Sequence, residues 1–186
     1  MIKSIIISGP PAVGKTTIAK GIAEEFGLTH LSGGDILKEL AEEEGFKTGG
    51  DDWWDTQDGM NFLSHRQANS EFDRKVDEKL KKHFLGGNVV ITSYTLPWLV
   101  QGGVKIWLES SKENSAQRMT TRDNLSKDSA LEIVQKRYQE NKKIYKELYG
   151  FEFGEDLSVF DKIIETDGLN ASQVLDIAKT DVRKLF

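Results

Sequence analysis

The residues of clearest chemical meaning form the segment GPPAVGKT, from Gly9 to Thr16. This segment satisfies the pattern G-x-x-x-x-G-K-[ST], whose glycines allow successive backbone N–H groups to turn inward around a phosphate. The apolar run Ile5-Ile6-Ile7 precedes the segment, and a helical pattern of apolar residues follows it. Phosphate-binding loops need this strand–loop–helix context, because the start of the helix adds a positive dipole. The sequence therefore predicts a binding site for ATP or GTP.

Two side chains of this loop have expected roles in phosphate chemistry. Lys15 can reach the β- and γ-phosphates and is the expected catalytic cation, while the Thr16 hydroxyl can ligate Mg²⁺. The residues expected to bind the nucleotide are Gly9, Pro10, Pro11, Ala12, Val13, Gly14, Lys15, Thr16 and Thr17. The expected cofactors are therefore ATP and Mg²⁺. The alternative, a glycine-rich turn that binds nothing, is disfavoured by the strand before the loop and the helix after it.

Composition excludes several other kinds of site. The 186 residues contain no Cys, which excludes disulfides, thiolate nucleophiles and zinc sites built on Cys. The three His residues show no metal-ligand spacing. The chain has 25 basic and 30 acidic side chains, a formal net charge of −5, which disfavours a general nucleic-acid coat. No apolar run approaches the ~18 residues of a membrane helix, so we expect a soluble, cytoplasmic protein that binds neither nucleic acid nor membranes.

Strands and helices are expected to alternate along the chain. Apolar runs predict strands at 2–8, 29–32, 89–91, 104–108 and 163–164, the fourth with buried and exposed residues in alternation. Helices are predicted to follow Gly14, to begin at Asp35, to begin near Ser70, to follow a cap at Ser110, and to span about 128–149 and 172–185. This alternation is typical of a single α/β domain with a parallel sheet and helices on both faces.

Several blocks of the sequence, in order and at plausible spacing, resemble the archaeal-type cytidylate kinase family of nucleoside-monophosphate kinases. These blocks are GPPAVGKTTIAK, LSGGDILKELA, FDRKVDEKL with GNVVI, VKIWL, and YKELYG with DLSVFDKIIET. The resemblance implies one P-loop kinase domain over residues 1–186, with a five-stranded parallel sheet. It also implies an acceptor-binding arm at approximately 35–86 and a lid at approximately 118–145. The implied reaction is phosphoryl transfer from ATP to a nucleoside monophosphate, CMP or dCMP.

The same resemblance implies roles for four residues outside the loop. Arg118 and Arg122 are four residues apart, so they share one helix face, and they would close on the transferring phosphoryl group as catalytic cations. Arg137, on the next expected helix, is a further candidate for this catalytic cluster. Asp35 would help to hold the hydration shell of Mg²⁺ between the substrates. The alternatives are surface arginines at helical spacing and a carboxylate that only caps a helix.

The acceptor side departs from the family pattern. After the third expected strand the family usually has an acidic-Gly-x-Arg stretch, but this chain has Thr92-Ser93-Tyr94. Lys38 and Tyr94 therefore stand where two phosphate-binding arginines are expected, and Ile144 stands in the place of another. Glu109, just past a strand end, could replace the missing carboxylate. The acceptor half of the site is thus expected to differ from that of the family.

The pair Trp53-Trp54 lies in an acidic, turn-rich stretch to which the sequence assigns no regular structure. One interpretation is a stacking platform for an acceptor base, and the other is a hydrophobic anchor for an irregular loop. The residues expected to bind the acceptor are Asp35, Lys38, Trp53, Trp54 and Tyr94.

Two other functions remain open from the sequence. One is a kinase for a different small acceptor, and the other is a module that changes conformation when it binds ATP. Arg118 and Arg122 favour an enzyme, whereas the missing carboxylate and arginine favour the alternatives. The expected partners are small-molecule nucleotides, and the expected state is a monomer or a weak homo-oligomer.

Overall fold

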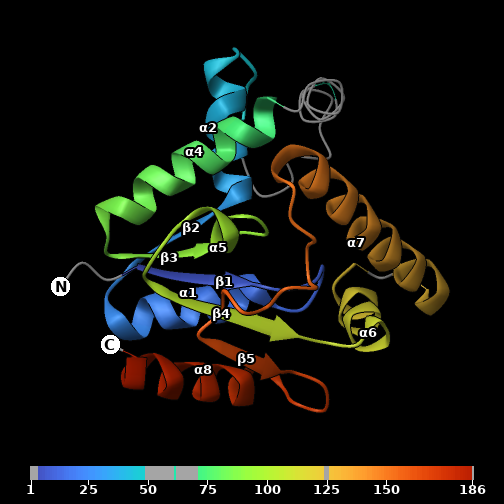
Figure 1. The fold of residues 1–186 in the computed structure, drawn as a ribbon. Coiled ribbons are helices and arrows are strands. Elements are labelled where there is room, and N and C mark those ends of the chain that lie inside the picture. The colour runs from blue at the N-terminus through green and yellow to red at the C-terminus, as the bar shows by residue number, and fades with distance from the viewer. Residues whose placement is uncertain (1–3, 49–60, 62–70, 124–125, 186) are drawn as a thin grey trace.

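The computed structural model describes residues 4–48, 61, 71–123 and 126–185 (Figure 1). Its elements are β1 (Ser4–Ser8), α1 (Lys15–Phe26), β2 (Thr29–Ser32), α2 (Gly33–Glu43), α4 (Glu71–Gly86), β3 (Val89–Thr92), α5 (Leu96–Leu99), β4 (Val104–Glu109), α6 (Lys112–Asp123), α7 (Lys127–Tyr149), β5 (Lys162–Glu165) and α8 (Ala171–Leu185). The five strands form one parallel sheet in the order β2-β3-β1-β4-β5. The predicted five-stranded parallel α/β fold is therefore confirmed.

Helices cover both faces of this sheet (Figure 1). α1 and α8 pack together on one face, while α2, α4 and α5 lie on the other. α6 and α7 pack against each other beyond the end toward which β4 points. Because all five strands run in the same direction, the segments that follow them meet at one edge of the sheet, the usual place for a ligand in such folds.

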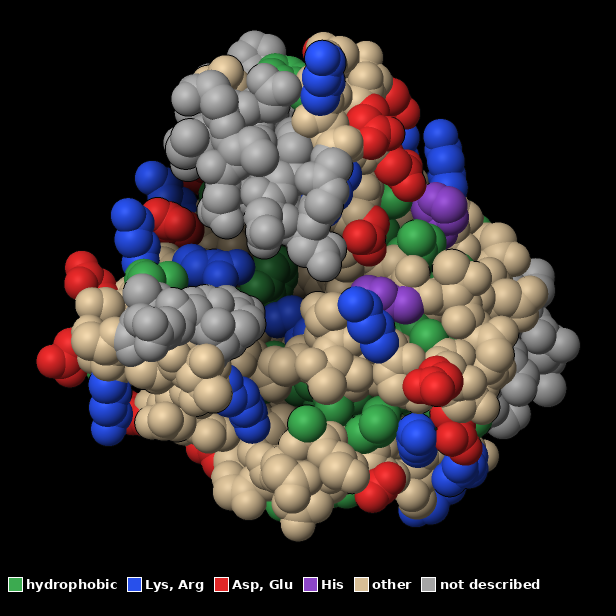
Figure 2. All heavy atoms as spheres, turned by 180° about the vertical axis from the view of Figure 1, so that it is seen from behind, with side chains coloured by type: hydrophobic (Ala, Val, Ile, Leu, Met, Phe, Trp, Pro, Cys, Tyr) green, Lys and Arg blue, Asp and Glu red, His purple; other side chains and the backbone are tan. Residues whose placement is uncertain are grey.

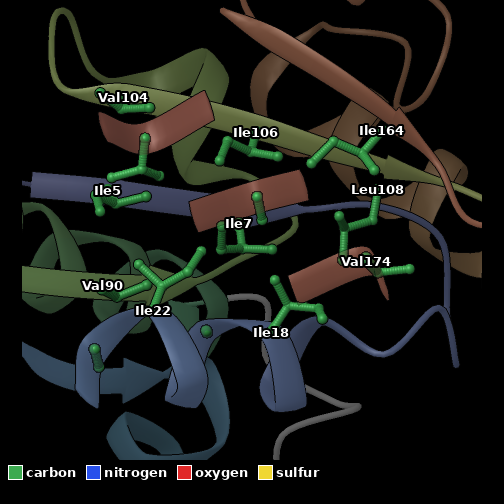
Figure 3. Close-up of a cluster of buried hydrophobic side chains, with 14 of the residues drawn as sticks. Ile5, Ile7, Ile18, Ile22, Val90, Val104, Ile106, Leu108, Ile164 and Val174 are labelled. Carbon is green, nitrogen blue, oxygen red and sulfur yellow. The ribbon is translucent and has the colours of Figure 1, made fainter. Parts of the chain in front are cut away.

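The central strand, β1, is buried on both of its faces. The side chains of Ile5, Ile6 and Ile7 are fully buried. Ile5 and Ile7 belong to the core between the sheet and the helices α1 and α8, which Figure 3 shows in close-up. Ile6 belongs to the opposite core, with residues of α2 and α4. This confirms the predicted strand. Because both faces of β1 are buried, the strand has little freedom to rotate, and the chain leaves it toward Gly9 in a fixed direction.

β4 does not show the predicted alternation of buried and exposed residues. Lys105 and Trp107 are buried like the apolar residues beside them, because the second face of the strand is covered as well. The Lys105 ammonium donates to the backbone oxygens of Pro97 (2.7 Å) and Val100 (2.6 Å). These bonds hold the end of α5, a short helix that the sequence did not predict. Burial lowers the pKa of Lys105.

Two helices begin differently from the sequence prediction. α2 begins at Gly33 rather than at Asp35, because Ser32 is its N-cap and Asp35 completes a capping box with that serine. α6 is capped by Ser111, whose hydroxyl accepts a backbone N–H of the first turn (3.2 Å), rather than by Ser110. In both helices a hydroxyl directly before the first turn satisfies an open backbone donor.

Other predicted boundaries agree with the structure. Gly27 ends α1 in a left-handed conformation (φ 64°), with its N–H bonded to the backbone oxygen of Ala23. α4 ends at Gly86 and α7 at Tyr149, as the sequence predicts. The expected start of a helix near Ser70 lies outside the described residues. Over the described ranges, no helix is both long and apolar enough to cross a bilayer.

A buried carboxylate connects three parts of the chain. Asp77, on α4, is 8% exposed. It accepts hydrogen bonds from the hydroxyls of Thr95, just before α5, and of Tyr149, the last residue of α7, the second at 2.6 Å. Burial and the bond to Asp77 raise the pKa of Tyr149, so that its hydroxyl stays protonated as a donor. We call these three side chains the Asp77 junction.

We expect Asp77→Ala to lower the free energy of unfolding by about 2–3 kcal/mol, because it leaves two hydroxyl donors without their acceptor. Tyr149→Phe removes one bond of the same junction and should cost about 1 kcal/mol. Urea denaturation of both variants measures the two losses. Equal losses would contradict the assignment of Asp77 as the centre of the junction.

Candidate functional site

A pocket of about 810 Å³ opens at the carboxyl edge of the sheet, beside the loop that follows β1. Loop and α1 residues 12–18 form one wall, and Asn114, Arg118 and Met119 of α6 form another. Tyr94, Arg137 and the segment that leads from β5 into α8 complete it. The pocket therefore gathers side chains from five separate stretches of the chain. Figure 2 shows the molecule from behind, with Lys and Arg side chains around a hollow near the centre of that face.

The loop between β1 and α1 contains three residues in backbone conformations that favour glycine. Gly9, Ala12 and Gly14 have positive φ angles of 145°, 60° and 98°. Gly14 is also the N-cap residue of α1, so the loop leads directly to the positive end of that helix. A Cβ atom at Gly9 would collide with the backbone oxygen of Leu108 on β4. The glycine is required there because the loop presses against the neighbouring strand.

Lys15 lies against the loop with its ammonium group facing the pocket. The ammonium donates to the backbone oxygens of Gly9 (3.0 Å) and Pro10 (2.7 Å). It also lies over the ring of Tyr94, 4.4 Å from the ring centroid. Burial lowers the pKa of Lys15, and Arg137 lowers it further, while Tyr94 raises it. Phosphate oxygens placed in this pocket would find a partly desolvated cation within reach.

Arg118 and Arg137 meet at this pocket from two different helices. Arg118 donates to the backbone oxygens of Val13 (3.3 Å) and Thr166 (3.0 Å), so it connects the phosphate loop to the end of β5. Its third acceptor is the Ser110 hydroxyl (3.3 Å), and burial lowers the pKa of its guanidinium. Arg122 is on α6, but its side chain lies outside the described residues. Two of the three predicted arginines thus line the same pocket as Lys15.

The start of α6 is held by a carboxylate that sequence reasoning missed. Both oxygens of Asp167 accept the backbone N–H of Ser111 (3.1 and 3.2 Å), and one also accepts from the Asn114 amide (2.7 Å). These bonds lower the pKa of Asp167 to about 2. Asp167 therefore fixes Asn114, and with it the first turn of α6, against the loop after β5.

Sequence reasoning also missed the far end of the pocket, formed by Asn114, Leu169 and Asn170. These residues carry no motif. Their only sequence signal is position, since segments that follow parallel strands β4 and β5 must reach the same edge as the phosphate loop.

The predicted acceptor residues are not all brought together. Asp35 is exposed, and its carboxylate accepts from the backbone N–H (2.8 Å) and the hydroxyl (2.7 Å) of Ser32. Asp35 and Lys38 are on α2 and do not line the pocket. Tyr94 does line it, next to Lys15. Trp53 and Trp54 lie outside the described residues.

Glu109 does not stand in for the carboxylate that the strand end lacks. Its side chain accepts from the indole N–H of Trp107 (2.7 Å) and from the backbone N–H of Ser110 (3.2 Å). It is absent from the pocket wall. Glu109 instead fixes the corner between β4 and α6.

A magnesium ion fits this site only together with a nucleotide. Among the described residues, no group of three or more His, Cys, Asp or Glu side chains is arranged to hold a metal ion. The exposed Thr16 hydroxyl does line the pocket. Nucleotide-bound Mg²⁺ takes most of its ligands from phosphates and water, so one protein hydroxyl suits it.

Comparison with known proteins agrees with this geometry. Residues 4–168 match the model of the "Cytidylate kinase-like family". The cytidylate kinase of Methanocaldococcus jannaschii is 33% identical over 186 residues, covering 97% of this chain and 98% of the relative. The cytidylate kinase of Pyrobaculum calidifontis is 33% identical over 176 residues, covering 94% of this chain and 89% of the relative.

Solved structures share the fold at lower sequence identity. The shikimate kinase from Bacteroides thetaiotaomicron has a TM-score of 0.63 at 15% identity, covering 100% of this chain and 98% of that one. The shikimate kinase from Acinetobacter baumannii, in complex with shikimate, has a TM-score of 0.56 at 18% identity, covering 99% and 95%. These neighbours confirm the P-loop kinase fold.

We expect Gly9→Ala to lower ATP affinity at least tenfold and to destabilise the fold. The added Cβ would meet Leu108 and would also have to adopt a strained φ of 145°. Gly86→Ala is the matched control, since a Cβ there meets nothing within 4 Å and Gly86 has no positive φ. Calorimetric titration with ATP and urea denaturation test both variants. Wild-type affinity in a folded Gly9→Ala protein would contradict the close approach of loop and strand.

Proposed function

Because the chain belongs to the cytidylate kinase-like family, we propose that it transfers the γ-phosphoryl group of ATP to CMP or dCMP. The observation that carries this proposal is the pocket at the carboxyl edge of the sheet. It brings Lys15 and the phosphate loop together with Arg118 and Arg137 from two other helices. A phosphate-binding loop surrounded by arginines suits a reaction in which negative charge must be held and neutralised.

The donor nucleotide would lie along the pocket. Its triphosphate would bind the inward-turned loop, residues 9–17, and Lys15 would exchange its two backbone acceptors for phosphate oxygens. The base would lie at the opposite end, beside Asn114 and the segment at Leu169 and Asn170, which line the same pocket. This orientation directs the γ-phosphoryl group toward the acceptor side of the loop.

In the transfer, an oxygen of the acceptor phosphate attacks the γ-phosphorus, and the bond from that phosphorus to the β,γ-bridging oxygen breaks. The products are ADP and a nucleoside diphosphate, with no covalent enzyme intermediate. Lys15, Arg118, Arg122 and Arg137 are the proposed catalytic cations. Their contribution is to position the two substrates and to neutralise charge on the transferring group.

Mg²⁺ would be held by the ATP phosphates and the Thr16 hydroxyl, with Asp35 reaching its hydration shell through water. Bound there, the ion would neutralise phosphate charge and fix the conformation of the triphosphate. The capping bonds of Asp35 use one carboxylate oxygen, Oδ2, so the cap and a water-mediated contact are compatible.

The acceptor is proposed to contact Asp35, Lys38, Trp53, Trp54 and the hydroxyl of Tyr94. A lysine and a tyrosine hydroxyl each lack the two parallel N–H donors that arginine offers to phosphate. If each loss weakens binding by ~1.5–3 kcal/mol, CMP is held roughly ten- to a hundredfold less tightly per position. We therefore propose a high Michaelis constant for CMP.

We also propose that the enzyme acts on free nucleotides in the cytoplasm, as a monomer or weak homo-oligomer, and binds neither nucleic acid nor membranes. The net charge of −5 supports this proposal, because polyanions and anionic lipid surfaces attract basic proteins.

The decisive experiment is steady-state kinetics of the purified protein with ATP, Mg²⁺ and a panel of nucleoside monophosphates and small phosphate acceptors. We expect CMP or dCMP to be the best acceptor, with a Michaelis constant well above the micromolar range. Lys15→Ala should abolish ATP binding and turnover without unfolding the chain, since it removes a loop cation and no core side chain. Preference for an acceptor other than a nucleoside monophosphate would overturn the proposal.

We further expect Arg118→Ala and Arg122→Ala each to lower turnover by ~10³ or more, with smaller effects on ATP affinity. Arg183→Ala is the matched control, because Arg183 is on α8 and pairs with Glu25. Turnover and ATP affinity should be measured for all three variants. Unchanged turnover in both Arg118→Ala and Arg122→Ala would mean that these arginines only support the structure.

A further inference from the structure

The ring of Tyr94 is the aromatic neighbour of the catalytic lysine. The Lys15 ammonium lies 4.4 Å from the centroid of that ring, well inside the distance at which a cation is attracted to an aromatic face. Tyr94 follows β3 and Lys15 follows β1, so two adjacent strands bring them together. Both residues line the pocket.

The Tyr94 ring packs against other aromatic side chains. Tyr94 meets Phe153 edge to face, with centroids 5.6 Å apart, and it lies 6.3 Å from Tyr145. Phe153 is fully buried and packs in turn against Trp107 (5.5 Å). We call this set, which also includes Trp98 and Tyr138, the aromatic cluster. Its packing limits the positions that the half-buried Tyr94 ring can adopt beside the ammonium.

The contacts of Lys15 differ in how they respond to a nucleotide. The ammonium has three N–H donors, and the structure uses two of them on the backbone oxygens of Gly9 and Pro10. Phosphate oxygens must replace these acceptors. The contact with the ring face requires no particular N–H direction, so it persists while the donors turn to phosphate.

We propose that Tyr94 is a positioning residue for Lys15, whose ammonium its ring face holds in the phosphate loop for the β- and γ-phosphates of the donor nucleotide. This role rests on the ATP-binding part of the proposed function and is independent of the acceptor. It assigns the ring to the donor side. Lys15 shares a partly desolvated pocket with Arg137 and Arg118, where a neutral, electron-rich ring can hold an ammonium without cancelling its charge.

The test compares Tyr94→Phe with Tyr94→Leu by calorimetric titration of ATP with Mg²⁺, in the absence of any acceptor. Tyr94→Leu removes the ring and should weaken ATP binding about three- to thirtyfold, the range of a partly desolvated cation–aromatic contact. Tyr94→Phe keeps the ring and should stay within about twofold of the wild type. If the leucine variant does not fold, Tyr94→Met serves the same purpose.

Two controls separate this role from general damage to the structure. AMP lacks the β- and γ-phosphates, so its affinity should be the same in wild type and Tyr94→Leu. Tyr138→Leu also removes a ring of the aromatic cluster, at a residue that does not line the pocket, and should leave ATP affinity unchanged.

The inference is wrong if Tyr94→Leu binds ATP like the wild type, or if Tyr94→Phe loses as much affinity as Tyr94→Leu. It is also wrong if Tyr94→Leu raises only the Michaelis constant for CMP. Failure of the wild-type protein itself to bind ATP would overturn the proposed function, and that result is distinguishable because it appears before any substitution is made.

Discussion

The site depends on one close approach, between the backbone of Gly9 and the backbone oxygen of Leu108. β1 is held in the middle of the sheet by three isoleucines buried on alternate faces. Gly9, the first residue after it, lies so near to β4 that no side chain fits between them. This contact sets the height of the phosphate loop above the sheet. The other residues that line the pocket with Lys15 are positioned relative to this contact.

Separate hydrogen bonds hold the neighbours of the phosphate loop at the same edge of the sheet. Arg118 bonds to the loop at Val13 and to the end of β5 at Thr166. Asp167, whose hydrogen bonds lower its pKa to about 2, fixes the start of the helix that carries Arg118. The arginine and the phosphate loop are thus connected through backbone atoms as well as through any bound phosphate. The protein's own hydrogen bonds therefore hold the donor side of the site together.

The position of the phosphate loop could be predicted from the sequence because it depends on neighbouring residues. A glycine pattern between an apolar strand and a helix requires only neighbouring residues, and parallel strands then bring their ends to one edge. Asn114, Asp167 and Asn170 could not be predicted in the same way. Asn114 and Asp167 depend on the bond between their side chains, 53 residues apart in sequence, and Asn170 joins the pocket wall from the segment after β5. The cap of α6 was missed for a smaller reason, since either of two adjacent serines could have supplied the hydroxyl.

The Asp77 junction has a consequence for the order in which the chain folds. Its acceptor on α4 and its donor on Tyr149 are 72 residues apart in sequence. Between them lie β3, β4 and the helices α5 and α6, so forming this hydrogen bond closes a long loop of the chain at an entropic cost. Contacts of such long range slow folding, and parallel pairing adds to the delay. Docking the end of α7 therefore closes one of the long-range contacts of the fold, and on a ribosome Tyr149 is added only after β1, β2, β3 and β4 have been synthesised.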